Sequence, residues 1–164
     1  MGLELLLEER LGLRNSASQH DRRKIIQSII DRLASENIIL ELLRNADPYV
    51  QSATLEYLEY QLTADLAEVV LEIALNADIP WLRSKALFTL STAPSAAPSD
   101  TLQRVRPLLS HSSQEVLLGV LGLWYVLDPH GAYGLASEFL NDDRPEVENL
   151  AFAIRRRVEE AGKS

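Results

Sequence analysis

Apolar residues recur at spacings of three and four through most of the chain, and short polar breaks separate the apolar segments. This spacing predicts amphipathic helices, and no stretch shows the sustained alternation of a strand. The pattern predicts ten helices in five successive pairs and no sheet. The predicted pairs are 2–13 with 19–34, 36–45 with 48–62, 65–76 with 79–91, 99–110 with 113–127, and 132–141 with 144–161.

Four segments of the chain repeat one another without internal gaps: 42–50, 74–82, 108–116 and 139–147. Each ends on an apolar anchor residue, and the anchors are Val50, Leu82, Val116 and Val147, at separations of 32, 34 and 31 residues. The pattern continues beyond each anchor, with Thr54, Ala86, Val120 and Ala151 four residues on, and Leu55, Leu87, Leu121 and Phe152 five residues on. A fixed period of this length is typical of stacked helical repeats.

Each repeat has the composition of a helix, a tight turn and a second helix. Two leucines, replaced by Ala74 and Leu75 in the second repeat and by Phe139 and Leu140 in the last, close the first helix, and polar residues that compete for backbone hydrogen bonds follow them. Before the second helix stand candidate capping carboxylates and first-turn prolines: Asp47, Asp78 and Asp143, with Pro48, Pro80 and Pro145. Pro107 falls inside the predicted helix 99–110 and should kink it.

This pattern resembles the HEAT-repeat family, in particular its short variety of about thirty residues per unit, as in the HEAT-like repeats of phycobilin lyases and related bacterial proteins. The match rests on the Leu-Leu-x-x-x-Asp-Pro-x-Val turn, the small residue four positions later, and the proline at Pro107. It departs from the family after the anchor, where Gln51, Arg83, Leu117 and Glu148 stand at a position that is often arginine.

The resemblance implies an all-α protein, a right-handed α-α superhelix of about five helical pairs. The chain is then a single domain over residues 1–164. Residues 1–34 form an N-terminal capping pair, which lacks the turn signature, and residues 36–161 form four repeats.

Composition narrows the function classes. Hydrophobic residues make up 46% of the 164, enough for a sizeable core, and the absence of cysteine excludes a disulfide framework, a thiolate metal site and a cysteine nucleophile. The first residues lack a signal-peptide pattern, and no apolar run approaches the length of a membrane span. We expect a cytoplasmic protein without a membrane partner.

The net charge of −8 is unevenly distributed. Residues 35–82 hold nine acidic side chains against Arg44 alone, whereas residues 14–32 carry an excess of bases. Because nucleic acids are bound by clustered lysine and arginine, we expect no nucleic-acid partner. The acidic block is either a solvated helical surface or a docking face for a basic protein.

The sequence offers little catalytic chemistry. None of His20, His111 and His130 precedes a glutamate or lies at ligand spacing from another histidine, so we expect no metal. No phosphate-binding, dinucleotide-binding or nucleophile-elbow motif is present, and we predict no enzyme activity and no cofactor. The helical glycines Gly119 and Gly122 indicate either a close helix approach or a ligand crevice.

In HEAT-like repeats the second helix of each pair lines the concave side. Counting from the anchors, the residues at plus two, plus six and plus nine should face away from the core. These positions include Ser52, Gly122 and Ala153, and the candidate partner-binding residues among them are Glu56, Glu59, Ser84, Phe88, Leu118, Tyr125 and Arg156. An aromatic centre with a charged rim is typical of protein interfaces. If the register is displaced by one residue, the aromatics are core instead; Trp81 and Trp124 are expected in the core in either case.

The leading functional hypothesis is a non-enzymatic protein–protein interaction module that presents a curved, partly acidic surface to a partner with a basic surface. Two alternatives come from the resemblance. One is a toxin-neutralising immunity protein of the same architecture, and the other is a phycobilin lyase-like protein that handles a chromophore.

Overall fold

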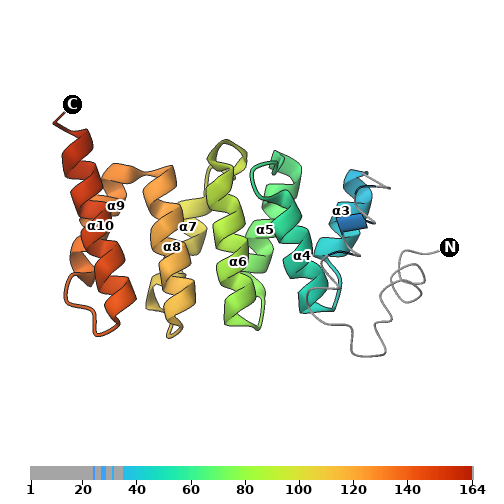
Figure 1. Ribbon diagram of the computed structural model, residues 1–164, viewed down its shortest axis with the longest axis horizontal. Coiled ribbons are helices and arrows are strands. Elements are labelled where there is room, and N and C mark those ends of the chain that lie inside the picture. Colours follow the sequence, from blue (N-terminus) through green and yellow to red (C-terminus); the bar gives the residue numbers. More distant parts are fainter. Residues whose placement is uncertain (1–23, 25–26, 29–30, 32–34, 164) are drawn as a thin grey trace. The chain divides into compact units, whose positions relative to one another are not determined.

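The computed structural model describes residues 35–163 together with Lys24, Gln27, Ser28 and Asp31. Apart from these four residues, the predicted capping pair 2–13 with 19–34 lies outside the described part. Within that part the chain is all-α, with eight α-helices, three short 3-10 helices and no strand (Figure 1). The chain divides into two compact units, residues 1–61 and residues 62–164, and each is described by itself.

The described part of the first unit is one helical pair, α3 (Glu36–Leu43) packed against α4 (Pro48–Leu58). Ser35 caps α3, its hydroxyl accepting a hydrogen bond from the Ile38 amide, and Asp47 caps α4 in the same way through the Tyr49 amide at 2.8 Å. Such caps satisfy amides that have no partner inside the helix. The prediction of a pair in this region is confirmed.

The second unit contains three successive pairs in two layers (Figure 1). One layer consists of α6 (Pro80–Thr92), α8 (Gln114–Leu127) and α10 (Pro145–Ala161), in which α6 packs against α8 and α8 against α10. The other elements are α5 (Ala64–Asn76), α7 (Thr101–Val105) and α9 (Pro129–Ala136), with the 3-10 helices η1 (Pro94–Ala96), η2 (Arg106–Ser110) and η3 (Ser137–Phe139). Each of α5, α7 and α9 contacts the second helix of its own pair.

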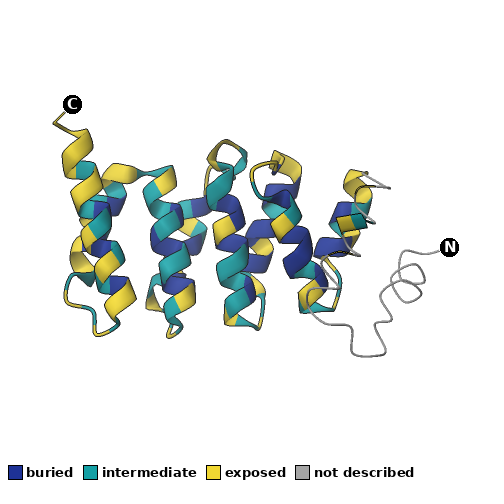
Figure 2. Cartoon of the chain, in the orientation of Figure 1, coloured by how far each residue is buried: buried dark blue, intermediate teal, exposed yellow. Residues whose placement is uncertain are grey.

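The four anchors of the repeat are buried, as their apolar character requires. None of them is more than 2% exposed, and the residues four positions later are completely buried in all four repeats. Leu55, Leu87 and Leu121, five positions after their anchors, are also buried. Figure 2 shows these buried segments on the helix faces that meet within each unit. The repeat pattern therefore marks the packed stripe of each second helix.

The side chain after the anchor closes the turn in two of the repeats. Gln51 donates to the carbonyl oxygen of Leu43, at the end of α3, at 2.7 Å, and the Arg83 guanidinium donates to the Ala77 carbonyl, at the end of α5. The last carbonyls of a helix have no partner within it, and these side chains supply one. Glutamine and arginine at this position therefore supply equivalent donors in these two turns.

The prolines occupy the predicted places, but two predicted caps are wrong. Pro48, Pro80 and Pro145 each begin a helix. Asp78 does not cap α6, because the N-cap residue of that helix is Ile79. Asp143 does not cap α10, because its N-cap residue is Arg144. In the last turn Asp142 accepts from the Arg144 amide instead, at the place where Asn45 accepts from the Asp47 amide in the first repeat.

Three predicted helix boundaries differ from the structure. The helix predicted over 48–62 ends at Leu58, and Tyr60 lies in the left-handed region with φ of 66°, a conformation that ends a helix. Pro107 divides the helix predicted over 99–110 into a short α-helix and a 3-10 helix, because proline lacks the N–H that the α-ladder needs. The ninth helix begins at Pro129, three residues earlier than predicted, because Asp128 caps it through the Gly131 amide at 2.9 Å.

Of the four residues that follow an anchor by five positions (the plus-five residues), only Phe152 lies outside a core. Leu87 lies against Gly119 of the following pair, and Leu121 belongs to a core cluster with residues of α10. Phe152, at the equivalent place in α10, is 54% exposed. Burial at this repeat position needs a helix packed on the outer side of α10, where Phe152 is exposed.

Two glycines of α8 offer a matched test of the packing between α6 and α8. A Cβ added at Gly119 would lie 3.0 Å from Cδ1 of the buried Leu87, whereas a Cβ added at Gly122 would meet no atom within 4 Å. Replacing either glycine by alanine gives the same gain in helix propensity. Only Gly119→Ala crowds the core, so we expect its free energy of unfolding to fall about 1–3 kcal/mol below that of Gly122→Ala. Urea unfolding of the two variants measures this, and equal stabilities would refute the close approach.

Candidate functional site

Five of the seven predicted partner-binding residues lie on one layer of the second unit. Ser84 and Phe88 are on α6, Leu118 and Tyr125 on α8, and Arg156 on α10. Because α8 packs against both other helices, the fold places these positions on three adjacent helices. The remaining two residues, Glu56 and Glu59, belong to the first unit.

Phe88 faces away from the core, as predicted. Its side chain is 48% exposed, whereas its neighbours Leu87 and Thr89 are completely buried. The Lys85 ammonium nitrogen lies 5.9 Å from the centroid of the Phe88 ring, within the range of a cation–π contact. The predicted register of α6 is therefore confirmed at this residue, and Ser84, one turn earlier, is half-buried.

Leu118 and Tyr125 are half-buried rather than fully exposed. Both pack against the core cluster that α8, α9 and α10 share. Their outer atoms remain at the surface, so they widen the apolar area of the layer but are also held in place by the core. Trp124, expected in the core, packs against the same cluster and is half-buried, as is Trp81 on α6.

Two of the three consecutive arginines of α10, Arg155 and Arg156, have different environments. Arg155 stacks over the Tyr133 ring of α9, with its guanidinium carbon 4.8 Å from the ring centroid, and donates to the Tyr133 hydroxyl, which in turn donates to Glu159. Arg156 is exposed and forms an ion pair with Glu160 at 2.8 Å; this hydrogen bond raises the pKa of the arginine. Arg155 therefore joins two helices, and Arg156 remains accessible at the surface.

Of the acidic candidates, Glu56 lies on the last turn of α4 and Glu59 directly follows the helix. Glu56 is exposed and Glu59 is half-buried at the end of the helix, and both take part in interactions within the chain. The prediction that Ser52 faces away from the core is wrong, because Ser52 is only 6% exposed. Val50 and residues 52–55 are all buried, so α4 buries a wider arc than a spacing of three and four describes.

The remaining polar groups of the described part are structural. The His111 Nδ1 accepts a hydrogen bond from the Ser113 amide in the turn ahead of α8, and Arg104 of α7 bonds Glu68 of α5 at 2.6 Å. No group of three or more metal-ligating side chains occurs among the described residues. In the same part of the chain, no helix combines the length and the apolar character that crossing a membrane would need.

Three exposed aromatic residues lie outside the predicted partner-binding set: Tyr49, Tyr60 and Phe152. Tyr60 is 78% exposed in the loop after α4, where the pattern had extended the helix, and Phe152 is exposed on α10. A plus-five residue such as Phe152 is covered only when a further helix packs on that side of its own helix. Nothing in the sequence marked Tyr60, because its left-handed backbone is usually taken by glycine.

Comparisons of the chain with models of protein families, with curated proteins and with solved structures found no match. The resemblance to HEAT-like repeats stays a prediction from the turn motif and the repeat period.

Substitution of two adjacent residues of α6 tests which side of the helix is packed in the core and which side is available for binding. Leu87→Ala removes a completely buried side chain, and we expect it to lower the free energy of unfolding by about 2–5 kcal/mol. Phe88→Ala truncates a half-exposed ring and should cost less than about 1 kcal/mol, in the range of surface substitutions with partial burial. Chemical denaturation of both variants checks this. A loss at Phe88 as large as that at Leu87 would make Phe88 a core residue.

The turn before α10 generates a pH-dependent prediction. The Arg144 guanidinium forms two hydrogen bonds of 2.7 Å with the Asp142 carboxylate, and chiefly because of the Arg144 side chain the pKa of Asp142 is lowered to about 2. A carboxyl with a lowered pKa in the folded state stabilises the fold above its ordinary pKa, near 4, and this stabilisation is lost as the pH falls towards 2.

We therefore expect Asp142→Asn to lower the melting temperature at neutral pH and to approach the wild type as the pH decreases from about 4 to about 2. The matched control is Asp143→Asn, because the neighbouring carboxylate is almost completely exposed and lies 3.9 Å from the guanidinium. Thermal unfolding across this pH range provides the measurement, and a constant difference between Asp142→Asn and wild type would contradict the assignment.

Proposed function

We propose that the protein is a non-enzymatic protein–protein interaction module, built as a right-handed superhelix of HEAT-like repeats, which binds a partner protein with a basic surface. The observation that carries the proposal is Phe88, a half-exposed aromatic ring on a helix whose neighbouring residues are completely buried. Aromatic side chains presented from a fixed backbone are the commonest source of binding energy in protein interfaces.

The neighbouring helix supports this role. Leu118 and Tyr125 of α8 reach the surface while packing against the core, so their conformations are fixed before any partner binds. A surface that is ordered in advance loses little conformational entropy on binding. With Phe88 they supply contact area, and Lys85 and Ser84 add polar groups at the edge.

Charge supports a basic partner. Nine of the acidic residues lie between residues 35 and 82, and Glu56 is exposed among them. An acidic surface accelerates the encounter with a basic protein through long-range attraction, and salt weakens that attraction. In this proposal the acidic residues set the rate of association, and the aromatic residues set the lifetime of the complex.

The test starts with affinity capture from the host organism and continues with binding kinetics on the captured partner. Reversal of the acidic pair, Glu56→Lys with Glu59→Lys, should slow association and reduce its dependence on salt. Phe88→Ala should instead speed dissociation, by roughly thirtyfold if the ring contributes about 2 kcal/mol.

A matched control separates local from global charge. Glu138→Lys with Asp143→Lys makes the same change in net charge at exposed positions far along the chain, and should leave the association rate close to that of the wild type. If the two double variants behave alike, net charge and not the acidic end of α4 governs the encounter. If neither Phe88→Ala nor the acidic reversal changes the kinetics, this surface is not the binding site.

A further inference from the structure

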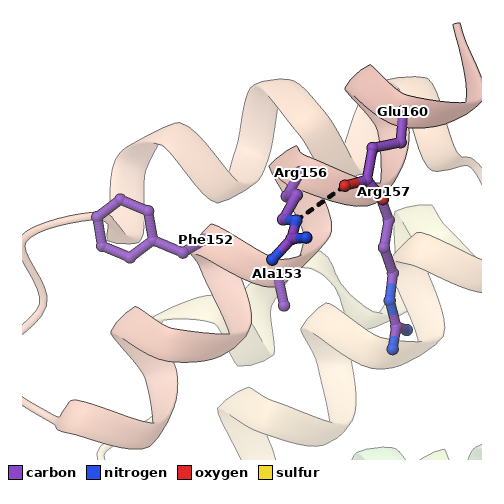
Figure 3. A pocket seen from close by; sticks show the side chains of 5 residues that line it. All are labelled: Phe152, Ala153, Arg156, Arg157 and Glu160. Atoms are coloured by element: carbon purple, nitrogen blue, oxygen red, sulfur yellow. Dashed lines mark hydrogen bonds and ion pairs between the residues drawn. The ribbon is translucent and has the colours of Figure 1, made fainter. Parts of the chain in front are cut away.

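A second exposed surface, which shares only Arg156 with the predicted partner-binding residues, lies on the outer side of α10. Phe152 projects from it with 54% of its side chain exposed, beside a hollow of about 390 Å³ (Figure 3). All of the residues that line the hollow come from this one helix: Phe152, Ala153, Arg156, Arg157 and Glu160. The opposite side of α10 is packed against α8 and α9 through Val147, Ala151 and Ile154.

The repeat pattern indicates what belongs on this side of α10. At the same distance from their anchors, Leu87 packs on the helix of the next pair and Leu121 shares a core with α10. Phe152 therefore occupies a stacking position, with an apolar side chain, on a helix that no described helix of the chain covers on that side. A large apolar side chain at such a position is expected to be covered by another helix.

The charged residues on either side of Phe152 are complementary to those of a second, antiparallel copy of the same helix. Glu148 precedes Phe152 by four residues and Arg156 follows it by four, so both lie on the same stripe of the helix, about one turn to either side. If two copies of α10 lie antiparallel with a twofold axis at Phe152, Glu148 of each copy faces Arg156 of the other. The two phenylalanine rings then meet between two ion pairs of opposite orientation.

We infer that the covering helix is α10 of a second copy of this chain, and that the protein forms a twofold dimer centred on Phe152. A uniformly basic or uniformly acidic partner would fit this stripe less well, because Glu148 lies on one side of the ring and Arg156, which is paired with Glu160 of its own helix, lies on the other. Ala153, next to Phe152, leaves room at the hollow for the ring of the other copy. The contact involves one helix from each copy, so the dimer belongs to the small, weak and concentration-dependent class of interfaces.

Sedimentation velocity of the full chain over a concentration series tests this inference. The wild type should shift from monomer to dimer as the concentration rises towards about 1 mM. Phe152→Glu should weaken the dimer at least tenfold, because it places two carboxylates at the axis. Phe88→Glu is the matched control, since it makes the same substitution at the other half-exposed phenylalanine and should leave dimerisation unchanged.

Charge exchange identifies the antiparallel arrangement. Glu148→Arg and Arg156→Glu should each weaken the dimer, because each places like charges opposite one another, and the double variant should restore it. Circular dichroism melts of every variant confirm that the fold is intact. A wild type that stays monomeric throughout the series overturns the inference and assigns the α10 surface to a different protein. A dimer that Phe152→Glu does not weaken, or a double variant that is not restored, also overturns it.

Discussion

In the second unit the structure depends on one constraint: the apolar stripes of α6 and α8 must be covered by their own partner helices and by the second helix of the neighbouring pair. In both α6 and α8, the anchor and the residues four and five positions later are almost completely buried. The two helices belong to different repeats, so the same three positions are buried in each repeat. In an isolated helical pair the partner helix covers only one side of the apolar stripe, and the other side is exposed to water. Stability therefore comes from the contacts between successive pairs as well as within them.

This constraint explains why the turns carry so many polar contacts. Helices that stack at short intervals bring their unsatisfied ends close to the core, where an unpaired amide or carbonyl is costly. Asp47 and Asp128 cap amides, while Gln51 and Arg83 donate to carbonyls at the end of the preceding helix. These side chains differ in chemistry, yet each removes an unsatisfied backbone group at a helix end.

The same constraint determines where surfaces are free to bind. On α6 the faces that meet neighbouring helices are closed, and Phe88 lies on the side that the stacking does not use. On α10 the stacking side itself is open, and Phe152 stands there beside charges of both signs. The two phenylalanines thus arise from different causes: one points away from the stack, and the other lies at its open end. A role in binding a basic protein is proposed for the first, and self-association for the second.

The sequence by itself determined the helical class of the described part, the anchors and the first-turn prolines, because these follow from local spacing and from the fixed geometry of proline. It also placed Phe88 on the outer side of its helix, since the position of a residue around a helix follows from its distance to a buried anchor. The extent of burial at the other candidate residues depended on neighbours that the sequence does not specify.

Only the tertiary structure decided that Ser52 is buried, that Tyr125 and Leu118 share the core of α8 and α10, and that Phe152 is exposed. It also selected Asp142 over Asp143 for the turn before α10, because a cap depends on backbone direction within a few residues. A periodic sequence places the same types of residue at the same positions in every unit, whereas the burial of those residues depends on what lies next to each unit in space. That is why Phe152 is exposed, although Leu87 and Leu121 at the same repeat position are buried.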